Sequence, residues 1–178
     1  MCMQKNAWER CVEFHGHVCP GLAIGYRASE AAIEKLNLSF SKDEEIVCVT
    51  ENDACGVDAV QVMTGCSIGK GNLIYRGTGK QAFSFFNRNT GDKVRIMFKK
   101  NLNKEGMDRE AMQKHILSAS LDDLFEFKEP SYAFPVNARL FTSITCEMCG
   151  ESATENKIRI HESKKVCLDC FPDYSRGW

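Results

Sequence analysis

The chain has 178 residues, of which 43% are hydrophobic and 26% charged, as expected of a globular protein with a real core. Its apolar runs fall well short of the roughly 18 residues of a membrane span, its N-terminus lacks the apolar core of a signal peptide, and its net charge of −1 gives no basic surface for nucleic acid. We therefore expect a cytoplasmic protein that binds neither nucleic acid nor membrane. In a reducing compartment, its ten cysteines predict metal binding or thiol chemistry rather than disulfides.

The first predicted helix covers residues 4–15 and ends at a group of metal-binding residue types. His15, His17 and Cys19 place two imidazoles and a thiol within five residues of one another. A histidine or cysteine alone is usually a packed or surface residue. The pattern His-x-His-x-Cys before Pro-Gly is instead typical of a functional site.

A second helix is predicted from Pro20 to Leu36, because the fixed φ of proline suits the first turn of a helix. Cys19 would then be its N-cap residue. Unpaired backbone N–H groups and the helix dipole favour a thiolate at that position, so we expect the pKa of Cys19 to be lowered. The two preceding histidines would serve as ligands or bases.

A β-branched run at 46–50 predicts a strand buried on both faces, and a short helix is expected to begin at Cys55 and end at Gly65. The order strand, turn, helix directs the Cys55 thiol into a crevice at the end of the strand. Cys19 and Cys55 are therefore expected to face one pocket. Two carboxylates lie nearby in the sequence, on Asp53 and Asp58.

The glycine-spaced loop at 66–72 holds Lys70, but it lacks the Walker pattern and no helix follows, so a plain turn is favoured over phosphate binding. Three strands are predicted next, at 73–75, 82–86 and 94–98. The turn-rich segments between them predict an antiparallel meander. A further helix is expected at 107–117, with His115 packed or on the surface rather than catalytic.

Two prolines after Lys128 break any regular pattern, and we place the domain boundary there. The predicted organisation is a core domain, a linker and a small module, at 1–128, 129–143 and 144–178. The prediction is that the core domain folds without the module.

The module carries the strongest signal in the chain, two Cys-x-x-Cys pairs that enclose 17 residues. The four cysteines are Cys146, Cys149, Cys167 and Cys170. This spacing predicts a closed, structural Cys₄ zinc site, with a rubredoxin-like iron centre as the alternative because the spacing alone does not choose the metal. From Cys146 onward six acidic residues face five basic ones, so the module is expected to bind protein or its own core domain rather than phosphates.

Several long motifs resemble the FmdE family, which is named after formylmethanofuran dehydrogenase. They are residues 14–27, 52–61 and 64–73, followed by Tyr75 and by 79–83, and together they cover most of 10–90. The resemblance implies an α+β core with a mixed or antiparallel sheet and packed helices, and a homodimer. It also implies an association with the larger pterin-dependent oxidoreductase that fixes carbon dioxide onto methanofuran in methanogenesis, without implying that this chain performs that reaction. The last four-cysteine module resembles the treble-clef or zinc-ribbon finger that some members append.

By position, the resemblance implies that His17, Cys19 and Cys55 are the core-site residues. Its second-rank candidates are His15, Asp58 and Cys66. Three functions stay open at this stage. In the first, His17, Cys19 and Cys55 hold a Zn, Ni or Fe ion with one open position, and Asp58 orients a ligand or acts as base.

In the second function, no metal is present: Cys19 attacks, His17 is its base and Cys55 resolves the product. In the third, the chain is a protein-interaction module whose finger docks onto a larger oxidoreductase.

Overall fold

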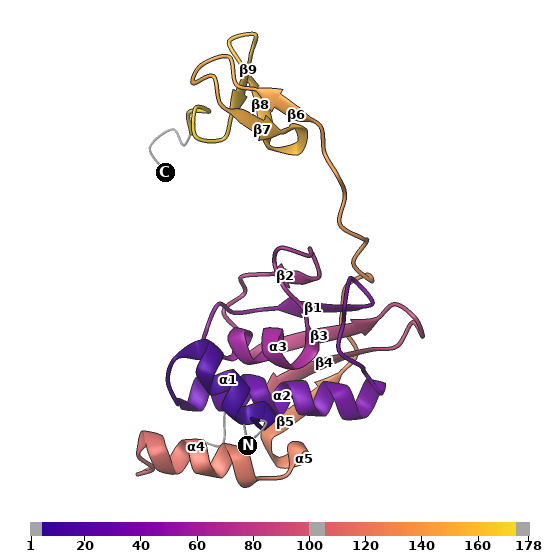
Figure 1. Ribbon diagram of the computed structural model, residues 1–178, viewed down its shortest axis with the longest axis vertical. Coiled ribbons are helices and arrows are strands. Elements are labelled where there is room, and N and C mark those ends of the chain that lie inside the picture. Colours follow the sequence, from indigo (N-terminus) through magenta and orange to yellow (C-terminus); the bar gives the residue numbers. More distant parts are fainter. Residues whose placement is uncertain (1–4, 100–105, 174–178) are drawn as a thin grey trace. The chain divides into compact units, whose positions relative to one another are not determined.

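The computed structural model describes residues 5–99 and 106–173 (Figure 1). The chain divides into two compact units, Met1–Ala138 and Arg139–Trp178. Among the helices in the described ranges, none has the length and apolar character needed to cross a membrane.

The first unit is built on a five-stranded mixed sheet with the order β2-β1-β3-β4-β5. Its strands are β1 Ile46–Thr50, β2 Leu73–Tyr75, β3 Ala82–Asn87, β4 Lys93–Phe98 and β5 Phe125–Lys128. β1 pairs in parallel with β2, and the other neighbours are antiparallel. The expected α+β fold with a mixed sheet is confirmed.

Two details of the predicted sheet are wrong. The expected meander fails at β2, which pairs with β1 rather than with β3, because the chain crosses from β1 to β2 through a helix and parallel strands need such a crossover. The strand β5 is absent from the sequence prediction. Its four residues follow directly on a short helix and continue its apolar character, which hides the change to extended backbone.

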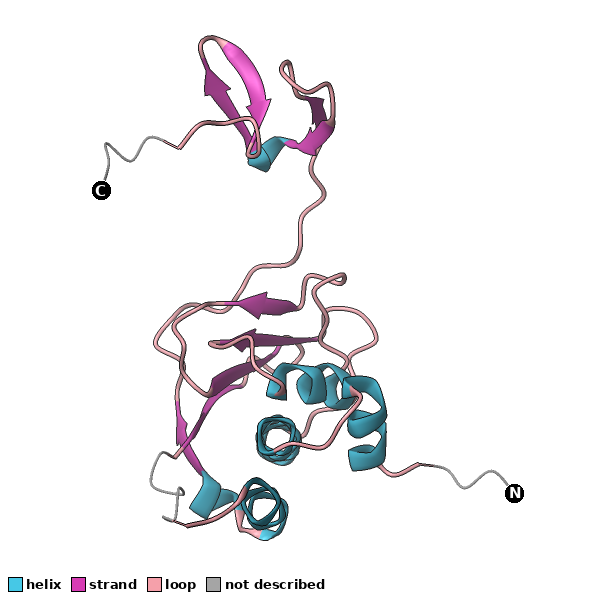
Figure 2. Ribbon diagram, turned by 90° about the vertical axis from the view of Figure 1, so that its left-hand side faces the viewer, coloured by secondary structure: helices cyan, strands magenta, loops and turns pink. Residues whose placement is uncertain are grey.

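Helices cover one face of this sheet (Figure 2). They are α1 Ala7–His15, α2 Pro20–Leu36, α3 Gly56–Thr64, α4 Arg109–Ser118 and α5 Leu121–Leu124. Both α2 and the end of α3 at Gly65 lie where the sequence predicted them. The first helix is shorter than predicted, because Asn6 caps it and closes a capping box with Glu9.

The core lies between α2 and the sheet. The buried alanines of α2 meet the inward-facing side chains of β1, β3 and β4, among them Cys48, Phe85 and Ile96. Cys48 is thus a core residue.

The opposite face of the sheet is covered by the segment that follows β5. Tyr132 and Phe134 pack against Phe86, at ring-centroid distances of 6.0 and 5.0 Å, in a cluster with Val47 and Val49. The first part of the expected linker, residues 129–138, therefore belongs to the first unit and completes its second apolar layer.

The second unit is a small module of two hairpins. They are formed by β6 Ser143–Thr145 with β7 Ser152–Thr154, and by β8 Ile158–His161 with β9 Lys164–Cys167, joined by a short 3-10 helix at Glu155–Lys157. Its buried centre is made by Cys146, Val166 and Cys167.

Candidate functional site

A close crossing of α2 and α3 brings the beginnings of these two helices together. A Cβ built on Gly25 would lie 2.0 Å from the backbone oxygen of Gly56, so only glycine fits at this contact. One turn earlier, a Cβ on Gly21 would lie 3.3 Å from Cys55 Cβ and 3.9 Å from Cys19 Sγ. The glycines of α2 thus place the two cysteines beside each other, as expected from the sequence.

The histidines reach the same point from the end of α1. His15 is the last residue of that helix, and Gly16 ends it with a left-handed φ of 87°, a conformation that glycine adopts without strain. The chain then turns back, so that the rings of His15 and His17 lie with their centroids 4.3 Å apart.

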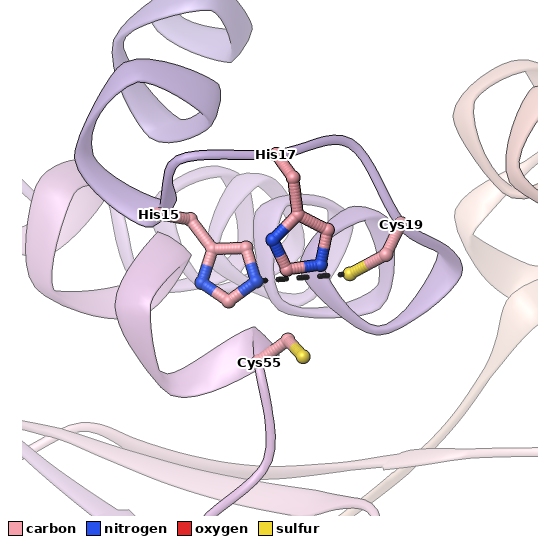
Figure 3. Close-up of side chains that lie close together, drawn as sticks. All are labelled: His15, His17, Cys19 and Cys55. Atoms are coloured by element: carbon pink, nitrogen blue, oxygen red, sulfur yellow. Dashed lines mark hydrogen bonds between the residues drawn. The ribbon is translucent and has the colours of Figure 1, made fainter.

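The side chains of His15, His17, Cys19 and Cys55 point toward one another (Figure 3). Each offers one ligand atom, and these four atoms all lie within 4.8 Å of one another. The sequence places His15 in the second rank, but the structure brings it into the cluster on equal terms with the other three.

His15 is held by Asp58. Its Nδ1 lies 2.7 Å from Asp58 Oδ2, and Asp58 Oδ1 accepts a hydrogen bond of 3.3 Å from Gln61 Nε2. Since an ionised carboxylate only accepts hydrogen bonds, Nδ1 carries the proton, and Nε2 is left with its lone pair. That Nε2 lies 3.9 Å from Cys19 Sγ, on the cluster side of the ring.

The two cysteines differ in how their helices hold them. Cys19 is the N-cap of α2, and its sulfur accepts a hydrogen bond of 3.3 Å from the backbone N–H of Leu22. Cys55 precedes α3 in a helical conformation and makes no capping bond. Burial, followed by the neighbouring Cys19 thiol, raises the pKa of Cys55 above its ordinary value. A thiolate is thus unfavourable at Cys55 beside Cys19 when no cation is present.

The donor set fits a tetrahedral metal ion. Zinc–sulfur bonds of about 2.3 Å and zinc–nitrogen bonds of about 2.0 to 2.1 Å give a tetrahedron with edges of about 3.3 to 3.8 Å. The 3.9 Å between His15 Nε2 and Cys19 Sγ is close to such an edge, and the rest of the cluster needs a contraction of less than about 1.5 Å from its upper bound of 4.8 Å. Imidazole and thiolate ligands suit zinc, iron or nickel rather than magnesium or calcium.

A cavity of about 630 Å³ opens beside this cluster, a size usual for small-molecule sites. Its described lining combines cluster members with residues from the ends of β1 and β2: His15, Thr50, Asn52, Asp53, Ala54, Cys55, Val57, Asp58, Gln61, Ile68, Leu73 and Tyr75. Asp53 and Asp58 are the charged side chains of that lining other than the histidine. The cavity therefore favours a neutral or cationic guest.

Other candidates from the sequence lie outside the cluster. Cys66 is buried, lies 3.5 Å from the backbone oxygen of Ile46, and has its pKa raised to about 11 by burial. Lys70 donates a hydrogen bond of 2.8 Å to the backbone oxygen of Ser41, which supports the structural turn that the sequence favours for its loop. His115 is partly buried on α4.

The sequence analysis missed two features of the site. It did not identify Gln61, which holds Asp58, or the role of Gly25 at the helix crossing. The spacing Gly21, Gly25 on one helix, with Gly56 at the start of the other, was the available signal for a close approach.

The four cysteines of the C-terminal module form a second cluster, with ligand atoms that also lie within 4.8 Å of one another. Cys149 Sγ and Cys167 Sγ are 3.9 Å apart, near the edge of a zinc–thiolate tetrahedron. Backbone N–H groups of Cys149 and Cys167 lower the pKa of Cys146 to about 6, so this sulfur is prepared to bind as thiolate.

Comparison with known proteins agrees with this geometry. Residues 14–126 match the family described as FmdE, molybdenum formylmethanofuran dehydrogenase operon. The chain belongs to the FmdE family. Residues 139–176 match the prokaryotic dksA/traR C4-type zinc finger, which together with the Cys₄ cluster supports a structural zinc in this FmdE protein.

Two individual proteins are similar to this FmdE chain. An FmdE-like protein of tungsten formylmethanofuran dehydrogenase from Syntrophus aciditrophicus has the same fold, with a TM-score of 0.70 at 24% identity over 91% of this chain and 88% of that one. A probable S-adenosyl-L-methionine-binding protein of Archaeoglobus fulgidus is 32% identical over 195 residues, which cover 93% of this chain and 52% of that protein. The chain thus spans about half the length of this relative.

Proposed function

We propose that this FmdE protein is a metal-binding protein with two sites, in which His15, His17, Cys19 and Cys55 hold a divalent transition metal apart from the zinc of the finger. The observation that carries the proposal is the convergence of four ligand atoms within 4.8 Å from the end of α1, the loop after it and the beginnings of α2 and α3. Side chains from separate elements meet at one point in this way when a shared ligand stabilises the arrangement.

The contact between His15 and Asp58 supports a metal rather than a purely structural role. Metal-bound histidines almost always donate their second ring N–H to a carboxylate or carbonyl, which fixes the tautomer and strengthens the ligand. Here Asp58 accepts from Nδ1 at 2.7 Å while Nε2 faces the cluster. Asp58 thereby orients a ligand, one of the two roles that the sequence suggests for it.

The unfavourable pairing of Cys19 and Cys55 also supports a cation. Each sulfur binds a metal as thiolate, and a cation between them removes the repulsion that raises the pKa of Cys55. We propose zinc as the occupant, with iron or nickel as the other ions that suit two imidazoles and two thiolates.

When bound, such an ion supplies Lewis-acid chemistry beside the 630 Å³ cavity. The chain's own residues would bind and orient a guest there: Tyr75 and Ile68 offer apolar surface, while Asp53 and Asp58 offer acceptors. Any role beside a larger oxidoreductase, through a homodimer or through the finger in the cytoplasm, belongs to the same proposal and rests on the family alone.

The experiment is elemental analysis of the full chain purified without added metal. We expect two metal ions per chain in the parent and one in Cys19→Ala and His15→Ala. Cys66→Ala is the matched control, since it removes a buried cysteine that lies outside both clusters and should leave two ions.

A parent with only the finger's zinc would contradict the metal proposal. If Cys19 of that parent were then alkylated readily near neutral pH, with Cys55→Ala slowing formation of an internal disulfide, the metal-free thiol mechanism would be favoured instead.

A second candidate concerns the guest of the cavity, because a relative is named for binding S-adenosyl-L-methionine. The acidic lining suits the sulfonium and ammonium groups of that molecule, and 630 Å³ is enough room for it. Calorimetric titration should show binding of S-adenosyl-L-methionine and weaker binding of the uncharged thioether S-adenosylhomocysteine. Equal affinities, or no binding, would contradict this candidate.

A further inference from the structure

The four residues of the core cluster are not held equally. Cys19 is 4% exposed, and the side chain of His15 is 11% exposed. Cys55 is partly buried under Gly21 of α2. His17 is exposed, although its ring points into the same cluster.

The anchoring of the four side chains follows the same division. The hydrogen bonds from Leu22 N–H to Cys19 and between His15 and Asp58 fix two of them, and the glycine-mediated crossing of α2 and α3 fixes Cys55. His17 lies in the loop between α1 and α2. Among the residues that the structure describes, it has no hydrogen-bond partner, and its ring contact is with His15.

This difference matters because four protein ligands complete a tetrahedron. A closed shell is the mark of a structural site, whereas a catalytic zinc keeps three protein ligands and one position for water or substrate. The chain already has a closed structural shell in its finger. The core cluster differs from it in having three anchored ligands and one that is exposed and unanchored.

We propose that His17 is an exchangeable ligand: His15, Cys19 and Cys55 hold the metal permanently, and His17 occupies the fourth position until an incoming ligand displaces it. This inference rests on the proposed metal site and goes beyond it by assigning a different role to one of its four residues.

The surroundings of His17 indicate what kind of ligand replaces it. A cleft of about 670 Å³ is lined by this histidine, by Val18 and Pro20, and by residues of α4. The α4 residues are Arg109, Glu110, Gln113 and Lys114. Two cations thus face one carboxylate, whereas the cavity on the His15 side carries Asp53 and Asp58. The position that His17 vacates is therefore suited to a small anionic ligand such as a carboxylate.

Cobalt-substituted full-length protein tests the exchange, with azide as the probe anion and visible spectra as the readout. His17→Ala should keep two metal ions per chain and lose no more than about tenfold in core-metal affinity. His15→Ala should lose about a hundredfold or more, since it removes both a ligand and its carboxylate contact. Azide should change the cobalt bands of His17→Ala at a concentration at least about tenfold lower than in the parent, because the variant has water where the parent has imidazole.

Two exposed residues on one helix provide a matched pair for the anion's route. At low ionic strength, Arg109→Gln should weaken azide binding to the cobalt protein a few-fold. Glu110→Gln should strengthen it, because it removes a negative charge and releases Lys114 from their 2.6 Å ion pair.

Each adverse result has a distinct meaning. If His17→Ala lost the core metal as completely as His15→Ala, or if azide left its spectrum unchanged, the exchange would be disproved while the metal site survived. If the parent held only the finger's metal, both proposals would fall together. If Arg109→Gln and Glu110→Gln had the same effect on azide binding, the anionic preference of the cleft would be wrong.

Discussion

Gly25 and Gly56 meet where α2 crosses α3, so closely that a Cβ on Gly25 would lie 2.0 Å from the backbone oxygen of Gly56. Backbone cannot yield there as the end of a flexible side chain can. The crossing determines how far Cys19 and Cys55 lie from each other, so the packing of two glycines and the geometry of the metal cluster are one property of the fold.

Gly25→Ala is therefore expected to damage both stability and metal binding. Forcing a methyl group into this contact should cost at least about 1 to 3 kcal/mol of unfolding free energy and should spread the cluster. Thermal unfolding and metal content of the variant provide the measurement. Gly69→Ala is the control, because a Cβ there meets nothing within 4 Å, and the variant should match the parent in both. An unchanged metal content in Gly25→Ala would contradict the link between crossing and site.

The carboxylate behind His15 gives the second prediction. Asp58→Asn keeps the size of the side chain but removes the charge that holds the Nδ1 proton, so the affinity of the core site for zinc should fall about tenfold to a hundredfold. Competition with a chromophoric chelator measures it. Asp53→Asn is the control, since Asp53 lines the same cavity and lies outside the cluster contacts. A loss of equal size in both variants would indicate a general effect of charge.

The elements predicted best from the sequence are those with local signals. The bounds of α2 follow from Pro20 and from the polar residues after Leu36, and the end of α3 follows from Gly65, because caps act on the residues beside them. The pairing of β2 was predicted wrongly, since turn residues indicate where a chain bends and not which strand it joins.

The site was predicted only in part for a similar reason. The sequence places His15, His17 and Cys19 close together, and helix starts indicate the direction of Cys19 and Cys55. Nothing local indicates that His15 meets Asp58, which lies 43 residues away, or that His15 is held more firmly than His17. Those facts depend on how α1 packs beside α3, which tertiary contacts decide.

A buried ion pair outside the site gives the third prediction. Glu51 has a side chain that is 3% exposed and accepts hydrogen bonds of 2.6 and 3.2 Å from Arg95 and one of 2.8 Å from Thr78. Arg95, then Thr78, lower the pKa of Glu51 below its ordinary 4.5. The stability from this pair is therefore present above about pH 4.5 and is lost as the pH falls through the lower, folded-state pKa.

Glu51→Gln should lose about 3 to 5 kcal/mol of unfolding free energy at pH 7, because it leaves a largely buried guanidinium without its carboxylate. Its stability should also fall less steeply than that of the parent below about pH 4.5. Chemical denaturation at several pH values measures both effects. Glu129→Gln, which removes an exposed carboxylate that is paired with Lys93, should leave the curve unchanged. A parallel acid limb in Glu51→Gln and the parent would contradict the assignment.

The segment after β5 gives the last prediction. Tyr132 and Phe134 cover Phe86 on the face of the sheet opposite the helices, and Arg88 donates a hydrogen bond of 2.8 Å to the backbone oxygen of Pro135. A chain that ends at residue 138 should therefore unfold cooperatively at the temperature of the core in the full protein. A chain that ends at residue 128 exposes that apolar face and should unfold at a clearly lower temperature.

Calorimetry on the two truncations makes the comparison, and Phe134→Ala in the full chain separates packing from chain length. Partial burial of an aromatic side chain is worth about 1 to 3 kcal/mol, so this variant should lower the unfolding temperature of the core without affecting zinc in the finger. If the shorter truncation were as stable as the longer one, residues 129–138 would be a linker after all, as their prolines suggest. If the longer truncation failed to unfold cooperatively, the core would depend on the finger, and the two units would fold as one.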